Sequence, residues 1–184
     1  MKTEIVHIVF SVIMLTLAAS AQELAPEFGG AKPPFLLMVA LSAAMHPDPT
    51  MPSRKSDGHS RRFGWLFVAA AAGLFADALD VLPLGCVASF TVFACAAARL
   101  ARGAAENLPV ALTGFLAGAI AAPCQEAWLD IWLPAGTAAP TLVRFFASAL
   151  PASVTGAALF AAMPAIARHI GLDGETIGRR RSGA

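Results

Sequence analysis

The chain is a succession of apolar runs separated by short polar or proline-containing segments. The runs cover about residues 5–21, 33–46, 63–79, 83–98, 108–124 and 145–167. The stretch from Phe63 to Ala98 would overshoot the hydrocarbon core, about 30 Å thick, as one helix, whereas two helices of about 17 residues fit it. The pattern therefore predicts an all-α integral membrane protein: a six-transmembrane-helix bundle formed by a single membrane domain over residues 1–184.

The basic residues predict the orientation of this bundle. Loops on the cytoplasmic side carry an excess of lysine and arginine. With the N-terminus inside, 11 of the 13 basic residues fall on the cytoplasmic side, most of them in a basic loop at 47–62 and a basic tail at 168–184. Only Lys32 and Arg144 remain outside. We therefore expect both termini to be cytoplasmic.

Composition agrees with a membrane location. The residues are 57% hydrophobic and 14% charged, and the mean hydropathy is +0.67. Soluble domains are less apolar and carry about 25% charged residues. The net charge of +1, the absence of tyrosine and the lack of a basic stripe with interleaved aromatics argue against a nucleic-acid partner.

The first apolar run has two interpretations. Ala19-Ser20-Ala21 is an A-x-A pattern before Gln22, as in a cleavable signal peptide. The segment before the run is only weakly basic, because Glu4 offsets Lys2. We favour an uncleaved anchor, and cleavage after Ala21 is the alternative.

Small residues at four-residue spacing indicate where helices pack closely. In lipid, helix association depends on close packing and polar contacts. Gly114-x-x-x-Gly118 is the best such pattern, and Ala152-x-x-x-Gly156 and the series Ala69, Gly73, Asp77 repeat it. We expect Gly114 and Gly118 to form a helix–helix contact within the monomer, with an oligomer or partner contact as the alternative.

Two carboxylates, Asp77 and Asp80, precede the turn Leu82-Pro83-Leu84-Gly85. Asp77 falls within the membrane by length, on the small face made by Ala69 and Gly73, where a charge is tolerated only against protein or water. We predict that Asp77 hydrogen-bonds a neighbouring helix end near Leu84 and Gly85 and that Asp80 is hydrated. The alternative is that both acids only mark the turn.

Signatures of catalysis and of metal binding are missing. The sequence has no H-E-x-x-H, no G-x-S-x-G, no P-loop and no GxGxxG. The three cysteines lie in apolar stretches without ligand spacing, and are interpreted as buried free thiols. The four histidines lie at the ends of apolar runs or in the basic loop. We therefore predict no enzyme, no catalytic or metal-binding residue and no cofactor.

The order of these features resembles the MreD family of bacterial rod-shape-determining membrane proteins. The resemblance covers roughly residues 5 to 170. It rests on the apolar anchor, the run Phe35-Leu36-Leu37-Met38-Val39-Ala40-Leu41 after a proline, and the hairpin Ala72-Gly73-Leu74-Phe75-Ala76-Asp77 through Leu82-Pro83-Leu84-Gly85. Two sequence features depart from the family: Pro33-Pro34 replaces its usual Pro-Asp, and the loop 47–62 replaces a tight basic turn.

The resemblance implies a non-enzymatic scaffold of the cell-wall elongation machinery in the bacterial inner membrane. Its expected partners are an MreC-like bitopic protein, an MreB-like actin filament and the peptidoglycan synthases. The scaffold would couple that cytoskeletal filament to peptidoglycan synthesis. The resemblance gives Gly73, Asp77 and Gly85 a structural role and implies no cofactor.

A second class of protein shares this architecture: the substrate-binding S component of an energy-coupling-factor vitamin transporter. Those proteins are also small six-helix bundles. They typically present alanines at four-residue spacing on the first helix, whereas Ile5 to Leu17 contains no alanine. That difference favours the shape-determining scaffold.

Overall fold

The computed structural model describes residues 2–27, 32–45, 64–80, 82–105, 107–132 and 141–169. These residues form six helices and no strand. The helices are α1 (Lys2–Leu24), α2 (Phe35–Met45), α3 (Gly64–Leu79), α4 (Cys86–Ala105), α5 (Val110–Trp132) and α6 (Thr141–His169). The predicted basic loop at 47–62 and the tail beyond His169 lie outside the described residues. The expected all-helical class is confirmed.

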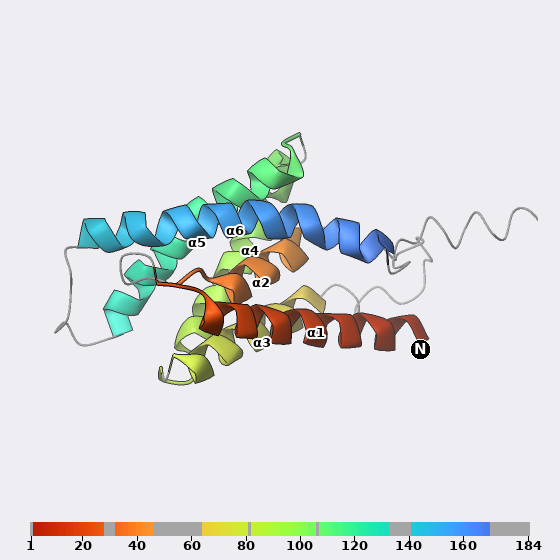
Figure 1. Cartoon of the computed structure of the whole chain (residues 1–184), viewed down its shortest axis with the longest axis horizontal. Coiled ribbons are helices and arrows are strands. Elements are labelled where there is room, and N and C mark those ends of the chain that lie inside the picture. The colour runs from red at the N-terminus through yellow and green to blue at the C-terminus, as the bar shows by residue number, and fades with distance from the viewer. Residues whose placement is uncertain are drawn as a thin grey trace, which may run out of the picture.

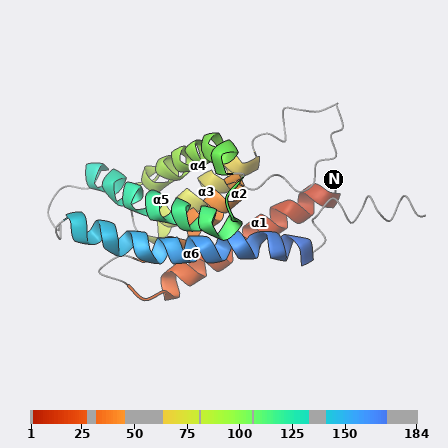
Figure 2. The ribbon, with the colours of Figure 1, turned by 90° about the horizontal axis from the view of Figure 1, so that it is seen from above.

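Successive helices run in opposite directions, so the described helices form an up-and-down bundle (Figure 1). The start of α1 and the end of α6 lie at the same end, at the right of Figures 1 and 2. We call this the terminal end. The opposite end, where α1, α3 and α5 finish and α2, α4 and α6 begin, is called the distal end.

Helix α2 is the centre of the bundle. It has only 11 residues, which rise about 16 Å, yet it contacts each of the other five helices. The residues from Leu36 to Ser42, together with Ala44, are buried. A helix that is apolar on all sides is stable only where other elements surround it. The uniform hydrophobicity of Phe35-Leu36-Leu37-Met38-Val39-Ala40-Leu41 is therefore explained by its central place.

Three helices are long and apolar enough to cross a membrane among the described residues: Cys86–Ala105, Val110–Trp132 and Phe145–Ile166. The apolar segments Val9–Leu24, Phe35–Met45 and Trp65–Leu79 are shorter. Large apolar side chains are exposed on the outside of the bundle, for example Phe67, Phe146 and Leu150. These features indicate a membrane protein, because lipid is the environment that covers such a surface without cost.

Several helix boundaries differ from the predicted ones. The predicted fifth run ended at Cys124, but α5 continues through Pro123 to Trp132. Proline also lies inside α6, at Pro151 and Pro164. Neighbouring helices and local polar groups compensate for proline in membrane helices, and a proline therefore does not mark a helix end there.

Candidate functional site

Helices α3 and α4 form a hairpin that brings Gly73, Asp77 and Gly85 together. Gly73 on α3 faces Ala88 on α4 so closely that a Cβ atom at Gly73 would overlap the backbone of Ala88. The buried alanines Ala69, Ala72 and Ala76 line the same side of α3. Because the side chains at this face are small, the two backbones approach each other, and an acid one turn after Gly73 can reach the start of α4.

The carboxylate of Asp77 caps the N-terminus of α4. Its side chain is 1% exposed. Oδ1 accepts a hydrogen bond from the backbone nitrogen of Val87 at 2.7 Å, and Oδ2 accepts from Gly85 at 2.8 Å and from Ala88 at 3.4 Å. The remaining amide, that of Cys86, donates to the carbonyl oxygen of Pro83.

This arrangement satisfies the backbone donors that a helix leaves without intrahelical partners in its first turn. A carboxylate is also stabilised near the positive end of the helix dipole. The hydrogen bonds predicted for Asp77 near Leu84 and Gly85 are present, and the alternative that Asp77 only marks the turn is wrong.

Gly85 completes the turn because of its backbone conformation. Its φ is +98°, and a Cβ atom there would meet no neighbouring atom within 4 Å. Glycine is therefore required for its left-handed backbone and not for lack of space. The hairpin thus depends on three residues. Gly73 lets the two helices approach closely, Asp77 caps α4, and Gly85 reverses the chain.

Gly114 and Gly118 pack α5 against α6. A Cβ atom at Gly114 would overlap the backbone of Gly156, and one at Gly118 would overlap the backbone of Ala152. The two small-residue patterns therefore face each other in antiparallel order, with Gly114 opposite Gly156 and Gly118 opposite Ala152. This is the predicted contact within the monomer.

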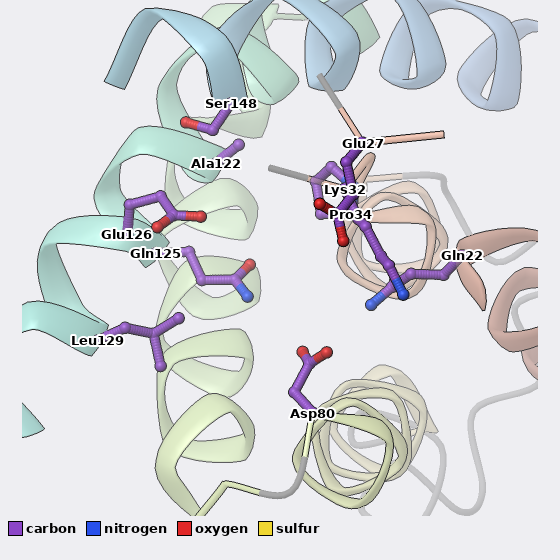
Figure 3. Close-up of a pocket in the computed structure, with 10 residues that line it drawn as sticks. All are labelled: Gln22, Glu27, Lys32, Pro34, Asp80, Ala122, Gln125, Glu126, Leu129 and Ser148. Carbon is purple, nitrogen blue, oxygen red and sulfur yellow. The ribbon is translucent and has the colours of Figure 1, made fainter. Parts of the chain in front are cut away.

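A polar cavity of about 290 Å³ opens at the distal end (Figure 3). It lies where α1 ends and α2 begins, beside the end of α3 and the distal parts of α5 and α6. Its polar lining consists of Gln22, Glu27, Lys32, Asp80, Gln125, Glu126 and Ser148. Its apolar lining consists of Pro34, Ala122 and Leu129. Of these residues, only Asp80 was expected from the sequence to be hydrated, and no cavity was predicted.

The two glutamines of the cavity are held by different environments. Gln22 is 7% exposed, and its Oε1 accepts a hydrogen bond at 3.3 Å from the backbone nitrogen of Leu36 at the start of α2. The Oε1 atom of Gln125 is buried and has no hydrogen-bond partner among the described residues. A buried acceptor without a donor costs free energy, so Gln125 is held less favourably than Gln22.

The charges of the cavity are unequal. Glu27, Asp80 and Glu126 contribute carboxylates, and Lys32 contributes the ammonium. The Lys32 Nζ atom also lies 3.6 Å from Oε2 of Glu23 outside the lining. The pKa of Asp80 is raised above its ordinary value, mainly by partial desolvation. The positive charge of Lys32 opposes this shift, whereas the negative charges of Glu23 and Asp77 add to it. The lining therefore holds more carboxylate than ammonium groups.

Trp128 connects the end of α5 to α4. Trp128 donates a hydrogen bond from Nε1 to the carbonyl oxygen of Cys86 at 3.0 Å and packs against Phe90 and Phe93. It therefore fixes the end of α5 to the start of α4. Trp132 follows one turn later and is exposed.

The thiols and imidazoles form no chemical site in the part of the chain that the structure describes. Cys86 and Cys95 are buried free thiols, as expected, but Cys124 is exposed. His169 is exposed at the end of α6, while the side chains of His7, His46 and His59 lie outside the described residues. No three His, Cys, Asp or Glu side chains among the described residues are placed to hold a metal ion.

Comparisons with protein-family models, with curated proteins and with solved structures find no match to this chain.

Proposed function

We propose that this protein is a non-enzymatic scaffold of the cell-wall elongation machinery, of the MreD type, in the bacterial inner membrane. It crosses the membrane six times with both termini in the cytoplasm. Its partners are an MreC-like bitopic protein, an MreB-like filament and the peptidoglycan synthases.

The α3–α4 hairpin carries this proposal. The residues on which the family resemblance rests, Gly73, Asp77 and Gly85, contribute to one packed structural element. The carboxylate of Asp77 is used to cap α4, and this use supports a structural role for the acid. A scaffold requires such rigid elements, because it acts by holding partners in fixed positions.

The arrangement of helices supports the proposed topology. The start of α1 and the end of α6 lie at the terminal end, which an even number of crossings requires (Figure 1). Arg99 and Arg102 lie near the end of α4, also at the terminal end, whereas acids gather at the distal end. By the excess of basic residues on the cytoplasmic side, the terminal end faces the cytoplasm.

The S component of a vitamin transporter is the second candidate, and the distal cavity favours it. A polar cavity between helices is the kind of place where small molecules bind. In the proposed orientation it opens away from the cytoplasm, as a site for uptake requires. The first helix argues against this candidate, since its exposed residues Val9, Val12, Ile13 and Leu17 are large and not alanines.

Depletion of the protein in its native cell separates the two candidates. The scaffold proposal expects rounded or widened cells and dispersed insertion of labelled cell wall, with unchanged vitamin uptake. Re-expression of Asp80→Asn or Gln125→Leu should restore shape, because neither residue belongs to the hairpin. Normal shape together with a specific uptake defect, which the wild type rescues and the two cavity variants do not, would replace the scaffold by the transporter subunit.

A further inference from the structure

Two arginines and a tryptophan form a basic surface where α4 ends and α3 begins. Arg99 and Arg102 lie three residues apart near the end of α4. The Cζ atom of Arg99 lies 5.3 Å from the ring centroid of Trp65, the second residue of α3. A guanidinium group is attracted to the negative face of an aromatic ring. Trp65 therefore holds the exposed Arg99 against α3, with the half-buried Arg102 beside it.

The described acids do not neutralise this pair of arginines. All acidic side chains whose positions the structure describes lie at or beyond the ends of α1, α3 and α5, which is the distal side of the bundle. Among the described residues, neither Arg99 nor Arg102 forms an ion pair with a carboxylate, and the recorded ion pair is that of Lys32 with Glu23. The two guanidinium groups therefore keep their charges and their N–H donors for a group outside the described chain.

The dipole of α4 accounts for only one of the two arginines. Basic side chains are favoured near the negative end of a helix, and this effect falls off within the last turn. Arg102 lies in the last turn of α4, whereas Arg99 lies before it. Arg99 is therefore explained by its contact with Trp65 and by its surroundings, and not by the helix end.

The surface next to these arginines is apolar and open to the bilayer. Leu100 lies between them in the sequence and is 89% exposed. Phe93 is 69% exposed and lies two turns earlier, so a spacing of seven residues places it on the same side of α4 as Leu100. This end of α4 therefore presents an apolar side followed by two positive charges, which is the order of acyl chain and phosphate in a phospholipid.

We propose that Arg99 and Arg102 bind the phosphate group of an anionic phospholipid, and that Trp65 is the positioning residue for Arg99. Guanidinium groups match phosphate oxygens in charge and in hydrogen-bond geometry. Basic pockets between transmembrane helices on the cytoplasmic side bind anionic headgroups. A zwitterionic lipid fits less well, because no described carboxylate pairs with the arginines to receive its cationic group. The site rests on the membrane location of the protein and not on the scaffold function.

The test titrates the full-length protein in detergent with phosphatidylglycerol and, separately, with phosphatidylcholine that has the same acyl chains. Native mass spectrometry gives the dissociation constant of the first bound lipid in each case. Phosphatidylglycerol should bind more tightly. Inorganic phosphate is added as a competitor, and it should not displace the lipid, because it lacks the acyl chains that contact α4.

Four variants locate the site. Arg99→Gln and Arg102→Gln should each weaken the binding of phosphatidylglycerol about fivefold and leave phosphatidylcholine nearly unchanged. Trp65→Leu should weaken it in the same selective way, whereas Trp65→Phe should keep most of the affinity, because it retains an aromatic face for Arg99. Thermal unfolding without added lipid verifies that each variant is folded.

Lys32→Gln is the matched control, since it removes a basic residue from the distal side of the bundle. A preference for phosphatidylglycerol that is lost in the two arginine variants and kept in Lys32→Gln supports the proposal. The proposal is overturned if the two lipids bind equally well, if folded arginine variants keep the preference, if Lys32→Gln loses it too, or if inorganic phosphate displaces the lipid. Normal cell shape after depletion would end the scaffold proposal and leave this result unaffected.

Discussion

The carboxylate of Asp77 lies 2.7 Å from the backbone nitrogen of Val87, on the next helix of the bundle. A cap of this kind normally comes from the residue that precedes the helix. Here that residue is Gly85, which has no side chain, and α3 supplies the acceptor instead. The tight turn and the cap are therefore separated: Gly85 reverses the chain, and Asp77 satisfies the helix.

Asp77→Leu should destabilise the protein far more than Asp80→Leu. The first change leaves the amides of Gly85, Val87 and Ala88 without an acceptor in a buried place, with an expected loss of about 2–5 kcal/mol. Asp80 is exposed, so leucine there leaves no buried amide without an acceptor. Thermal unfolding and the yield of monodisperse protein in detergent measure the difference. Equal, negligible effects at the two sites would contradict the capping role.

Gly73→Ala and Gly85→Ala should both destabilise, for different reasons. At Gly73 the new methyl group overlaps the backbone of Ala88 and separates α3 from α4. At Gly85 there is space, but the positive φ costs an L-residue about 1–2 kcal/mol. Gly85→Asn should therefore recover part of the stability, since asparagine tolerates this conformation, whereas Gly73→Asn should be worse than Gly73→Ala. Thermal unfolding of the four variants tests this ranking.

Gly118→Ala should weaken the contact between α5 and α6, because the added Cβ overlaps the carbonyl group of Ala152. Overpacking of this kind costs about 1–3 kcal/mol. Gly103→Ala is the matched control. A Cβ atom at Gly103, in the last turn of α4, meets nothing within 4 Å, and alanine favours helix there by roughly 0.5–1 kcal/mol. Stability measured for both variants should move in opposite directions, and a neutral Gly118→Ala would show that the helices separate without cost.

Local patterns of the sequence predicted much of this hairpin and of the α5–α6 contact. The spacing of Gly73 and Asp77 on one helical face requires only the helical period, and so does that of Gly114 and Gly118. The place of α2 was not predicted, because a uniformly apolar run has no polar face that indicates what surrounds it. The continuation of α5 beyond the fifth apolar run was not predicted, because Pro123 and the polar Gln125 resemble a helix end.

The distal cavity could not be predicted for another reason. Its lining comes from α1, the segment before α2, the end of α3, and α5 and α6, so residues as far apart as Gln22 and Ser148 meet in it. Each is an ordinary polar residue near the end of an apolar run. Only the packing of α1, α3, α5 and α6 around the start of α2 brings them together.

The orientation of the bundle is tested by cysteine labelling. In a variant with Cys86, Cys95 and Cys124 replaced by alanine, single cysteines are placed at Asp57, Gly103, Gly30 and Gly136. A membrane-impermeant maleimide should label the first two only from the cytoplasmic side and the last two only from outside, since the basic residues flank the first pair. Gly103 lies at the terminal end of α4, so its labelling also orients the described helices. Labelling at Asp57 from outside would invert the topology.

Asp80→Asn should make the protein slightly more stable at neutral pH. The pKa of Asp80 is raised, chiefly by desolvation, and Glu23 and Asp77 add to this while Lys32 opposes it. Because the folded-state pKa lies above the unfolded one, the ionised carboxylate costs folding free energy at neutral pH. That cost disappears as the pH falls through the raised pKa toward the ordinary carboxyl range, about pH 4.

The gain from asparagine should be about 0.5 kcal/mol or less, because the side chain is exposed, and it should vanish near that pH. Thermal unfolding of the wild type and of Asp80→Asn, at neutral pH and near pH 4, measures the gain. A variant less stable than the wild type at neutral pH would show that Asp80 stabilises the fold.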